Sequence, residues 1–290
     1  MDYVVRESAK VSSPLPRFPL SPLAGLVSIA SLLAFVGCAD FLASRDSDIR
    51  ETNQAIEKAR DDNQRAKAYS SRGVAYSEKA RYSRITKGVS NAEYERLFAF
   101  AIKDHNQAVA LNPGNAEVYF NRGQAYYDRG AGDLVENKDG KSWFDAAAAN
   151  FEKVIEKDPK NSRAFDMLGL TYEQNSQPDK AIQAYTREMA LDRRLGKSRL
   201  ATAYCYIGFQ HQQQQELGAA AAAYQKSTEF GIADDKSCPY DPFGNSIAIF
   251  TTETHEYDKA WEMVHRGLKM GRLVAPELLV RLQKESGRTY

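Results

Sequence analysis

Histidine, cysteine and tryptophan are scarce in this sequence, whose 290 residues include four, three and two of them. His255 begins "HEYDK", which lacks the second histidine four residues later that a zinc-protease helix needs. We find no nucleophile elbow and no acid–base pair with a physical reason to be strained. The sequence therefore predicts no catalytic residue, no metal site and no cofactor, and we do not expect an enzyme.

The chain also lacks an excess of one sign of charge. It carries 39 Lys and Arg against 38 Asp and Glu, a formal net charge of +1. A nucleic-acid-binding domain concentrates a basic surplus on one face, because it neutralises phosphates. We therefore expect no nucleic-acid partner, and the sequence indicates no small-molecule substrate.

One uncharged run, "FPLSPLAGLVSIASLLAFVGCA", occupies residues 18–39. Its densest apolar part, residues 23–37, has the length of a signal-peptide core, and it ends in "FVGC". This ending resembles the lipobox of bacterial lipoproteins, although that family prefers Leu at the position of Phe35. The resemblance implies that Cys38 is lipidated and becomes the mature N-terminus.

Two other interpretations of residues 1–38 stay open: ordinary signal-peptidase cleavage, and an uncleaved signal anchor. Each of the three places the rest of the chain outside the cytoplasm. We favour a lipoprotein or signal anchor, which places the chain in the bacterial cell envelope, attached to a membrane and facing the periplasm or the exterior.

A sequence frame recurs four times along the chain. The segments "YSSRGVAY", "YFNRGQAY", "FDMLGLTY" and "YCYIGFQH" surround Gly73, Gly123, Gly169 and Gly208. Each is followed by an alanine-rich amphipathic segment, such as "DKAIQAY" and "GAAAAAY". Two antiparallel helices that cross closely need small side chains at the contact, which explains glycine in the first helix and alanine in the second.

This frame resembles the tetratricopeptide repeat, a helix–turn–helix unit of about 34 residues. The resemblance covers residues 66–272, with copies that start near residues 66, 116, 162, 201 and 241. It implies an all-α fold: a right-handed superhelical solenoid of antiparallel helix pairs, with about five repeats. We expect a linker and leading helix at residues 39–65 and a C-terminal capping helix at residues 273–290.

The first two copies contain insertions. In the first, "SNAE" at residues 90–93 is a capping box, so we predict two lengthened helices with Tyr82 and Ile85 as partners of the new stripe. The second, "RGAGDLVENKDGKS", is glycine-rich and charged, and predicts a protruding loop. Because Val135 stands where a phosphate loop needs glycine, we interpret its "GKS", and a second "GKS" at Gly196, as solvated turns.

Two further residue types have specific expectations. His105 falls where the second helix usually places an aromatic side chain, so we predict that it is packed in the core. Cys205 and Cys238 come from adjacent copies, and we consider a disulfide between them as a hypothesis.

In tetratricopeptide arrays the first helices line a concave groove that binds a protein or peptide partner, and the resemblance implies which positions face it. The implied groove residues of the second copy are Glu117, Phe120, Gln124, Tyr127 and Asp128, those of the third are Arg163, Asp166, Leu170, Glu173 and Gln174, and those of the fourth are Thr202, Cys205, Phe209, Gln212 and Gln213.

Our leading hypothesis is an exported, membrane-tethered scaffold that binds another envelope protein in this groove. One alternative is a carrier that transiently binds unfolded or secreted segments. The other is an enzyme that uses Asp133, Glu136 and Asp139 of the second insertion.

Overall fold

The computed structural model describes residues 29–85, 90–231 and 240–288, with backbone alone for residues 29–39 and 85. The described residues form helices and contain no strand, which confirms the all-α prediction. The helices are α1 (Ile29–Lys58), α2 (Asp62–Ile85), α3 (Asn91–Leu111), α4 (Ala116–Val135), α5 (Lys141–Lys157), α6 (Ser162–Gln174), α7 (Pro178–Leu191), α8 (Arg193–Gln213), α9 (Leu217–Phe230), α11 (Pro242–Thr252), α12 (Tyr257–Lys269) and α13 (Pro276–Ser286).

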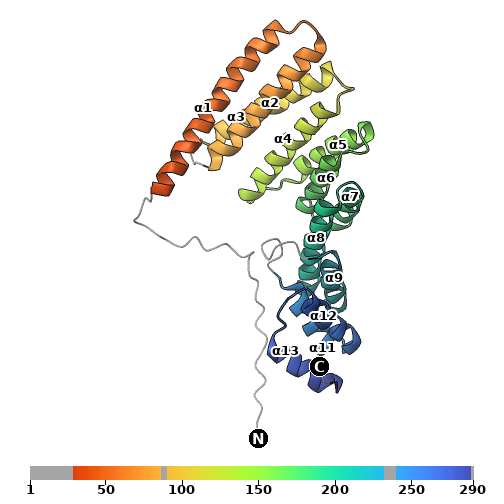
Figure 1. Cartoon of the computed structure of the whole chain (residues 1–290). Helices are drawn as coiled ribbons and strands as arrows, with labels where there is room; N and C mark the ends of the chain where they lie inside the picture. Colours follow the sequence, from red (N-terminus) through yellow and green to blue (C-terminus); the bar gives the residue numbers. More distant parts are fainter. Residues whose placement is uncertain (1–28, 86–89, 232–239, 289–290) are drawn as a thin grey trace.

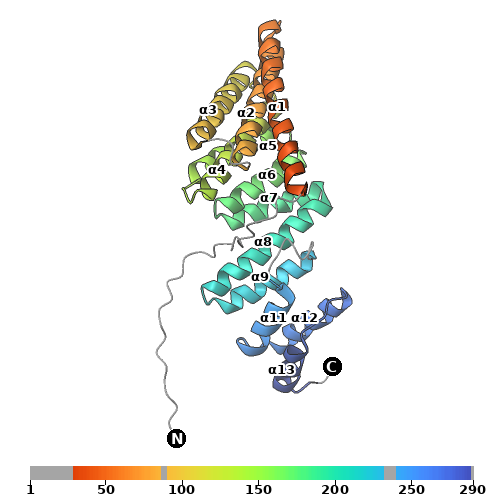
Figure 2. The same cartoon turned by 90° about the vertical axis from the view of Figure 1, so that its left-hand side faces the viewer.

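Five helix pairs make up the array: α2 with α3, α4 with α5, α6 with α7, α8 with α9, and α11 with α12. The pairs follow one another along the long axis of the molecule, with α1 and α13 at opposite ends (Figures 1 and 2). This arrangement is the helical solenoid that the repeat predicts.

Polar caps set where several helices begin. The side chains of Ser90, Asn115 and Asn161 accept hydrogen bonds from backbone amides two or three residues ahead, at 2.9–3.2 Å. Asp192 ends α7 and also caps α8, accepting from the amides of the residues two and three positions later. Because one residue serves both helices, α8 begins well before the predicted start of the fourth copy.

The recurring glycines allow the two helices of a pair to approach. A Cβ built on Gly169 would lie 2.2 Å from Tyr185 Cε1, and one on Gly208 would lie 2.7 Å from Tyr224 Cδ1. Gly123 meets the ring of Phe151 in the same way, at 2.9 Å. The glycine of the first helix therefore makes room for a large ring on the second helix, with alanine further along the same contact.

The first pair uses histidine in this position. A Cβ on Gly73 would lie 2.8 Å from the His105 ring, which is fully buried and has no hydrogen-bond partner at either nitrogen. The predicted core position of His105 is confirmed. Burial lowers its pKa to about 3, and the nearby charge of Arg122 acts in the same direction.

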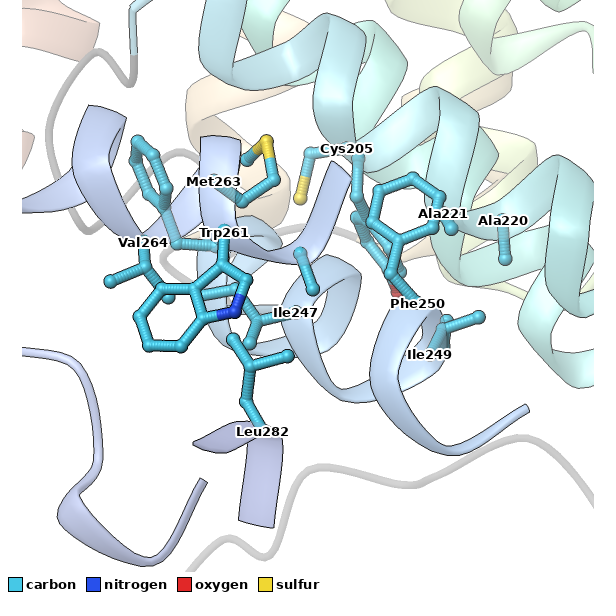
Figure 3. Close-up of a cluster of buried hydrophobic side chains, with 13 residues drawn as sticks. Cys205, Ala220, Ala221, Ile247, Ile249, Phe250, Trp261, Met263, Val264 and Leu282 are labelled. Carbon is cyan, nitrogen blue, oxygen red and sulfur yellow. The ribbon is translucent and has the colours of Figure 1, made fainter. Parts of the chain in front are cut away.

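The largest buried cluster lies at the C-terminal end of the array (Figure 3). Ile247 and Phe250 of α11 meet Met263 and Val264 of α12, and Leu282 of α13 is fully buried against them. α13 therefore covers the apolar surface that the last pair would otherwise expose.

At the other end, α1 packs on α2 in the place of a preceding second helix. The ring centres of Phe41 and Tyr82 lie 3.9 Å apart. Two ion pairs join the same helices, Arg45 with Glu78 at 2.5 Å and Asp46 with Lys79 at 2.6 Å. Tyr82 thus contacts α1, which we did not predict.

Most of the predicted signal segment lies outside the described residues. Cys38 falls within the backbone range of α1, and its side chain is outside the described part of the chain. Among the helices that the structure describes, none is both long and apolar enough to cross a membrane.

The two insertions differ from each other less than expected. The first is two lengthened helices, α2 and α3, as predicted, and Ser90 caps α3. The partner role of Ile85 lies outside the described side chains.

The prediction of a protruding loop for the second insertion is wrong. α4 continues to Val135 and α5 begins at Lys141, so residues 136–140 alone link them. Gly130 packs against the ring of Phe144, and a Cβ on Gly140 would lie 2.7 Å from the carbonyl oxygen of Gly130. The glycines serve close packing between the lengthened helices, which is why a glycine-rich composition misled us.

The prediction of a solvated turn at Gly196 is also wrong. Gly196 is buried inside α8, where a Cβ would lie 2.3 Å from the backbone nitrogen of Met189. Glycine is needed because the start of α8 crosses directly over the end of α7. The other triplet lies at the start of α5, with Lys141 and Ser142 exposed and Gly140 buried.

Candidate functional site

The predicted groove residues lie on α4, α6 and α8, the first helices of three consecutive pairs. Two hollows open beside them. One, of about 430 Å³, lies between α1, α2 and α4 and includes Glu117 in its wall. The other, of about 320 Å³, lies between α6 and α8 and includes Glu173 and Gln174.

Phe120 and Arg163 come together across two pairs. The guanidinium carbon of Arg163 lies 4.3 Å from the centre of the Phe120 ring, which also meets Phe151 edge to face at 5.5 Å. Phe120 is only 6% exposed. Most of its surface is thus used in holding α4, α5 and α6 together, and little is free for a partner.

Gln124, Tyr127 and Asp128 form the next group along α4. The Gln124 amide donates to the Asp128 carboxylate at 3.1 Å, and Arg81 of α2 lies 3.9 Å from the same carboxylate. Burial raises the pKa of Asp128 above its ordinary value, and Arg81 partly offsets this. Burial and the neighbouring Asp128 raise the pKa of Tyr127 as well.

Asp166 of α6 is held by Arg199 of α8. The guanidinium donates to both carboxylate oxygens, at 2.6 and 3.2 Å. Glu188 of α7 lies in the same region, fully buried, with no hydrogen-bond partner at either oxygen. Burial first, and Asp166 second, raise the pKa of Glu188 to about 8, so this side chain is neutral at pH 7.

Glu173 and Leu170 complete the predicted set on α6, and both are half-buried. The Tyr185 hydroxyl donates to the Glu173 carboxylate at 2.9 Å. Burial raises the pKa of Glu173, more than the charge of Arg199 lowers it. Glu173 is thus oriented by a neutral donor and forms no ion pair with any other described residue.

On α8 the chain itself covers two of the predicted groove residues, Phe209 and Cys205, whereas Thr202 and Gln212 are half-buried and Gln213 is exposed. The Tyr240 ring stacks on Phe209 with centres 3.9 Å apart, and Cys205 Sγ lies 3.5 Å from the Tyr240 carbonyl oxygen. Cys205 is fully buried and is disulfide-bonded. Its predicted partner, Cys238, lies outside the described residues, so that pairing stays a hypothesis.

Sequence reasoning missed the residues of α8 that line the hollow beside Glu173. These are Tyr206, Ile207 and Gln210, and Tyr206 is 45% exposed. They stand one or two positions away from those that the repeat frame assigns to the groove. The sequence signal was a tyrosine two residues before the recurring Gly208.

The acidic residues of the second insertion are engaged in structural contacts. Asp133 is buried, pairs with Arg129, and accepts from the Trp143 indole nitrogen at 2.9 Å. Glu136 pairs with Arg84 of α2 at 2.9 Å. Within the described residues, no three His, Cys, Asp or Glu side chains are grouped so that they could hold a metal ion.

Comparison with known families supports the repeat. A family described as "Tetratricopeptide repeat" matches residues 150–183, and one described as "TPR repeat" matches residues 99–130. The chain thus contains tetratricopeptide repeats and folds as a tetratricopeptide solenoid, a fold class typical of non-enzymatic scaffolds that bind proteins or peptides.

The chain is also similar to several solved structures, at low sequence identity. YrrB, described as a TPR protein with an unusual peptide-binding site, is 18% identical over 81% of this chain and 92% of its own, with a TM-score of 0.40. BtubC from P. vanneervenii is 15% identical over 87% and 93%, with a TM-score of 0.43. PilF from Pseudomonas aeruginosa is 15% identical over 87% and 100%, with a TM-score of 0.36. No curated protein matches the sequence.

Proposed function

We propose that this protein is a membrane-tethered adaptor of the cell envelope, which binds a segment of another protein along α4, α6 and the part of α8 that lines the hollow beside Glu173. The observation that carries the proposal is the pair of hollows beside these helices. Both have mixed polar and apolar walls, and predicted groove residues contribute to each. Such walls suit an extended polypeptide, which needs hydrogen-bond partners as well as apolar contact.

The covered positions on α8 restrict where a partner binds. Tyr240 stacks on Phe209, so a partner cannot use that ring without displacing Tyr240. The accessible part of the face therefore runs from Glu117 to Tyr206, both of which are exposed. Binding through this part leaves the C-terminal cluster and α13 undisturbed.

Site-specific photo-cross-linking tests the groove. A photoreactive amino acid is placed at Glu117, Arg163 or Gln174, and the control positions are Lys153 and Gln107, exposed on the second helices α5 and α3. We expect cross-links to the same one or few envelope proteins from the first three positions only. Equal products from all five positions, or none from the first three, would contradict the proposal.

The tether is a separate part of the proposal, supported by "FVGC" and the uncharged run before it. Multiple lipid chains on Cys38 would anchor the protein stably, whereas a single chain holds only marginally. We expect metabolic labelling with a fatty acid in the wild type and none in Cys38→Ser. A Cys38→Ser protein that still fractionates wholly with membranes would favour a signal anchor over a lipoprotein.

A further inference from the structure

We propose that the hollow between α6 and α8 binds a lysine or arginine side chain of the partner, with Glu173 as its counterion. This inference rests on the proposed function, since it names the chemistry that the partner presents at one point of the groove.

The wall of this hollow contains one carboxylate and no positive charge. Its residues are Glu173, Gln174, Ser176, Pro178, Ala203, Tyr206, Ile207 and Gln210. The guanidinium of Arg199, outside this wall, acts on the charge of Glu173, and it is already bonded through two nitrogens to Asp166. A cation of the partner therefore does not compete with a positively charged residue of the wall for Glu173.

Glu173 is oriented before any ligand arrives. One of its oxygens accepts from the hydroxyl of Tyr185, a fully buried residue whose ring is packed against Gly169. This bond orients the carboxylate without neutralising it, and burial raises the pKa of Glu173 by more than the Tyr185 hydroxyl and the charge of Arg199 lower it. A charge-assisted bond from an ammonium or guanidinium group would supply that charge.

The rest of the wall suits the stem of a long basic side chain. Tyr206 offers an aromatic surface that is 45% exposed, Ile207 offers an apolar one, and Gln174 and Gln210 offer amide oxygens. Lysine and arginine carry an apolar stem that packs on such surfaces, and their cations also favour aromatic rings. A neutral polar ligand would leave Glu173 without an ion-pair partner.

A tyrosine hydroxyl that donates to a glutamate occurs in a second hollow of this chain, and there a lysine lies beside the two residues. Between α5, α6 and α7, the Tyr172 hydroxyl donates to Glu152 at 2.7 Å, and Lys180 Nζ lies 5.2 Å from the centre of the Tyr172 ring. All three residues line one hollow. There the chain supplies its own lysine beside a tyrosine and a glutamate, whereas the wall beside Glu173 lacks this third member.

Selection of peptides on the full-length protein in detergent micelles tests the inference. Displayed random peptides are selected, and the tightest binder is compared with a version whose basic residue is replaced by norleucine. We expect the selected peptides to share one Lys or Arg, and norleucine to weaken binding to wild type about tenfold.

Three variants complete the design. In Glu173→Gln the amide oxygen still accepts from Tyr185, and we expect the norleucine penalty to disappear. Glu152→Gln is the matched control, because it removes a tyrosine-bonded carboxylate from the other hollow, and the penalty should persist. Gln210→Arg places a cation at an exposed position of the wall and should weaken the basic peptide about tenfold without affecting the fold.

The outcomes separate this inference from the proposed function. If peptides bind without a shared basic residue, or if the norleucine penalty is the same in Glu173→Gln, the pocket assignment is wrong while groove binding stands. If no peptide binds, the pocket assignment is also wrong, and the cross-linking at Glu117 and Arg163 decides separately whether the groove binds a protein.

Discussion

Replacing His105 by phenylalanine should make the protein more stable, and increasingly so in acid. His105 occupies the position that Phe151, Tyr185 and Tyr224 occupy in the following pairs, each against the glycine of its first helix. Its two ring nitrogens are buried without partners. An unsatisfied buried polar atom costs about 1–3 kcal/mol, so the apolar ring should stabilise the native state by about 1–2 kcal/mol at pH 8 after some repacking.

The pH dependence follows from the sign of the shift. The pKa of His105 is lowered from 6.5 to about 3 in the folded state, so between these values the unfolded state binds more protons. Stability contributed by neutral His105 is present above pH 6.5 and is lost as the pH falls toward 3. Integrating between pH 8 and pH 5 gives a loss of about 2 kcal/mol, which His105→Phe should abolish.

The assay is urea unfolding at pH 8 and pH 5, followed by far-UV circular dichroism. Since repeat arrays can unfold in parts, hydrogen exchange in α2 and α3 would locate the change. Phe151→His is the matched control and should introduce a similar acid-dependent loss in the second pair. If the stability difference between His105→Phe and wild type is the same at both pH values, our account of His105 is refuted.

Three other expectations concern single positions. Glu188→Gln should stabilise the protein above pH 8. The pKa of Glu188 is raised from 4.5 to about 8, so the wild type loses its stabilising proton as the pH rises, at about 1.4 kcal/mol per pKa unit. Urea unfolding at pH 6 and pH 9 measures the difference in stability between variant and wild type, and an equal difference at both pH values would contradict this account. Gly169→Ala should cost about 1–3 kcal/mol in thermal unfolding, because its Cβ would overlap a buried ring, whereas Gly218→Ala, with nothing within 4 Å, should cost nothing and gain up to about 1 kcal/mol. Peptide mapping without reduction should recover Cys205 linked to Cys238, and alkylation of both thiols in the unreduced protein would rule the bond out.

The fold could be predicted because its key contacts repeat. Glycine in the first helix and alanine or an aromatic in the second recur at fixed spacing, so one physical explanation applies to several pairs at once. His105 departs from the aromatic pattern in chemistry but keeps its place in the core. The start of α8 was not predictable in this way, since Asp192 caps it outside the repeating frame.

The prediction of a loop for the second insertion was wrong because glycine has two structural uses. In a loop it permits unusual backbone angles, and between helices it permits close approach. Gly130 and Gly140 serve the second purpose, which depends on Phe144 and on the backbone they meet. Composition alone cannot distinguish the two uses, because the distinction lies in a contact between different helices.

The repeat frame assigns residues to the groove, but it does not show which of them stay accessible, for a related reason. The repeat frame tells which side chains leave the first helices on the groove side, but successive first helices lie close enough for long side chains to reach one another. Arg163 therefore covers Phe120, and Arg199 holds Asp166. Residues that the frame assigns to a partner instead join one repeat to the next.

A groove carboxylate stays available to a partner protein where no arginine of a neighbouring repeat pairs with it. Asp166 has its arginine, whereas Glu173 has only the Tyr185 hydroxyl. A carboxylate that is held in place, half-buried and without a direct ion pair gains more from an incoming cation than an exposed one, because its charge is less screened by water. Recognition on this face should therefore depend less on the aromatic positions of the frame than on one basic residue of the partner, placed where the chain has omitted its own.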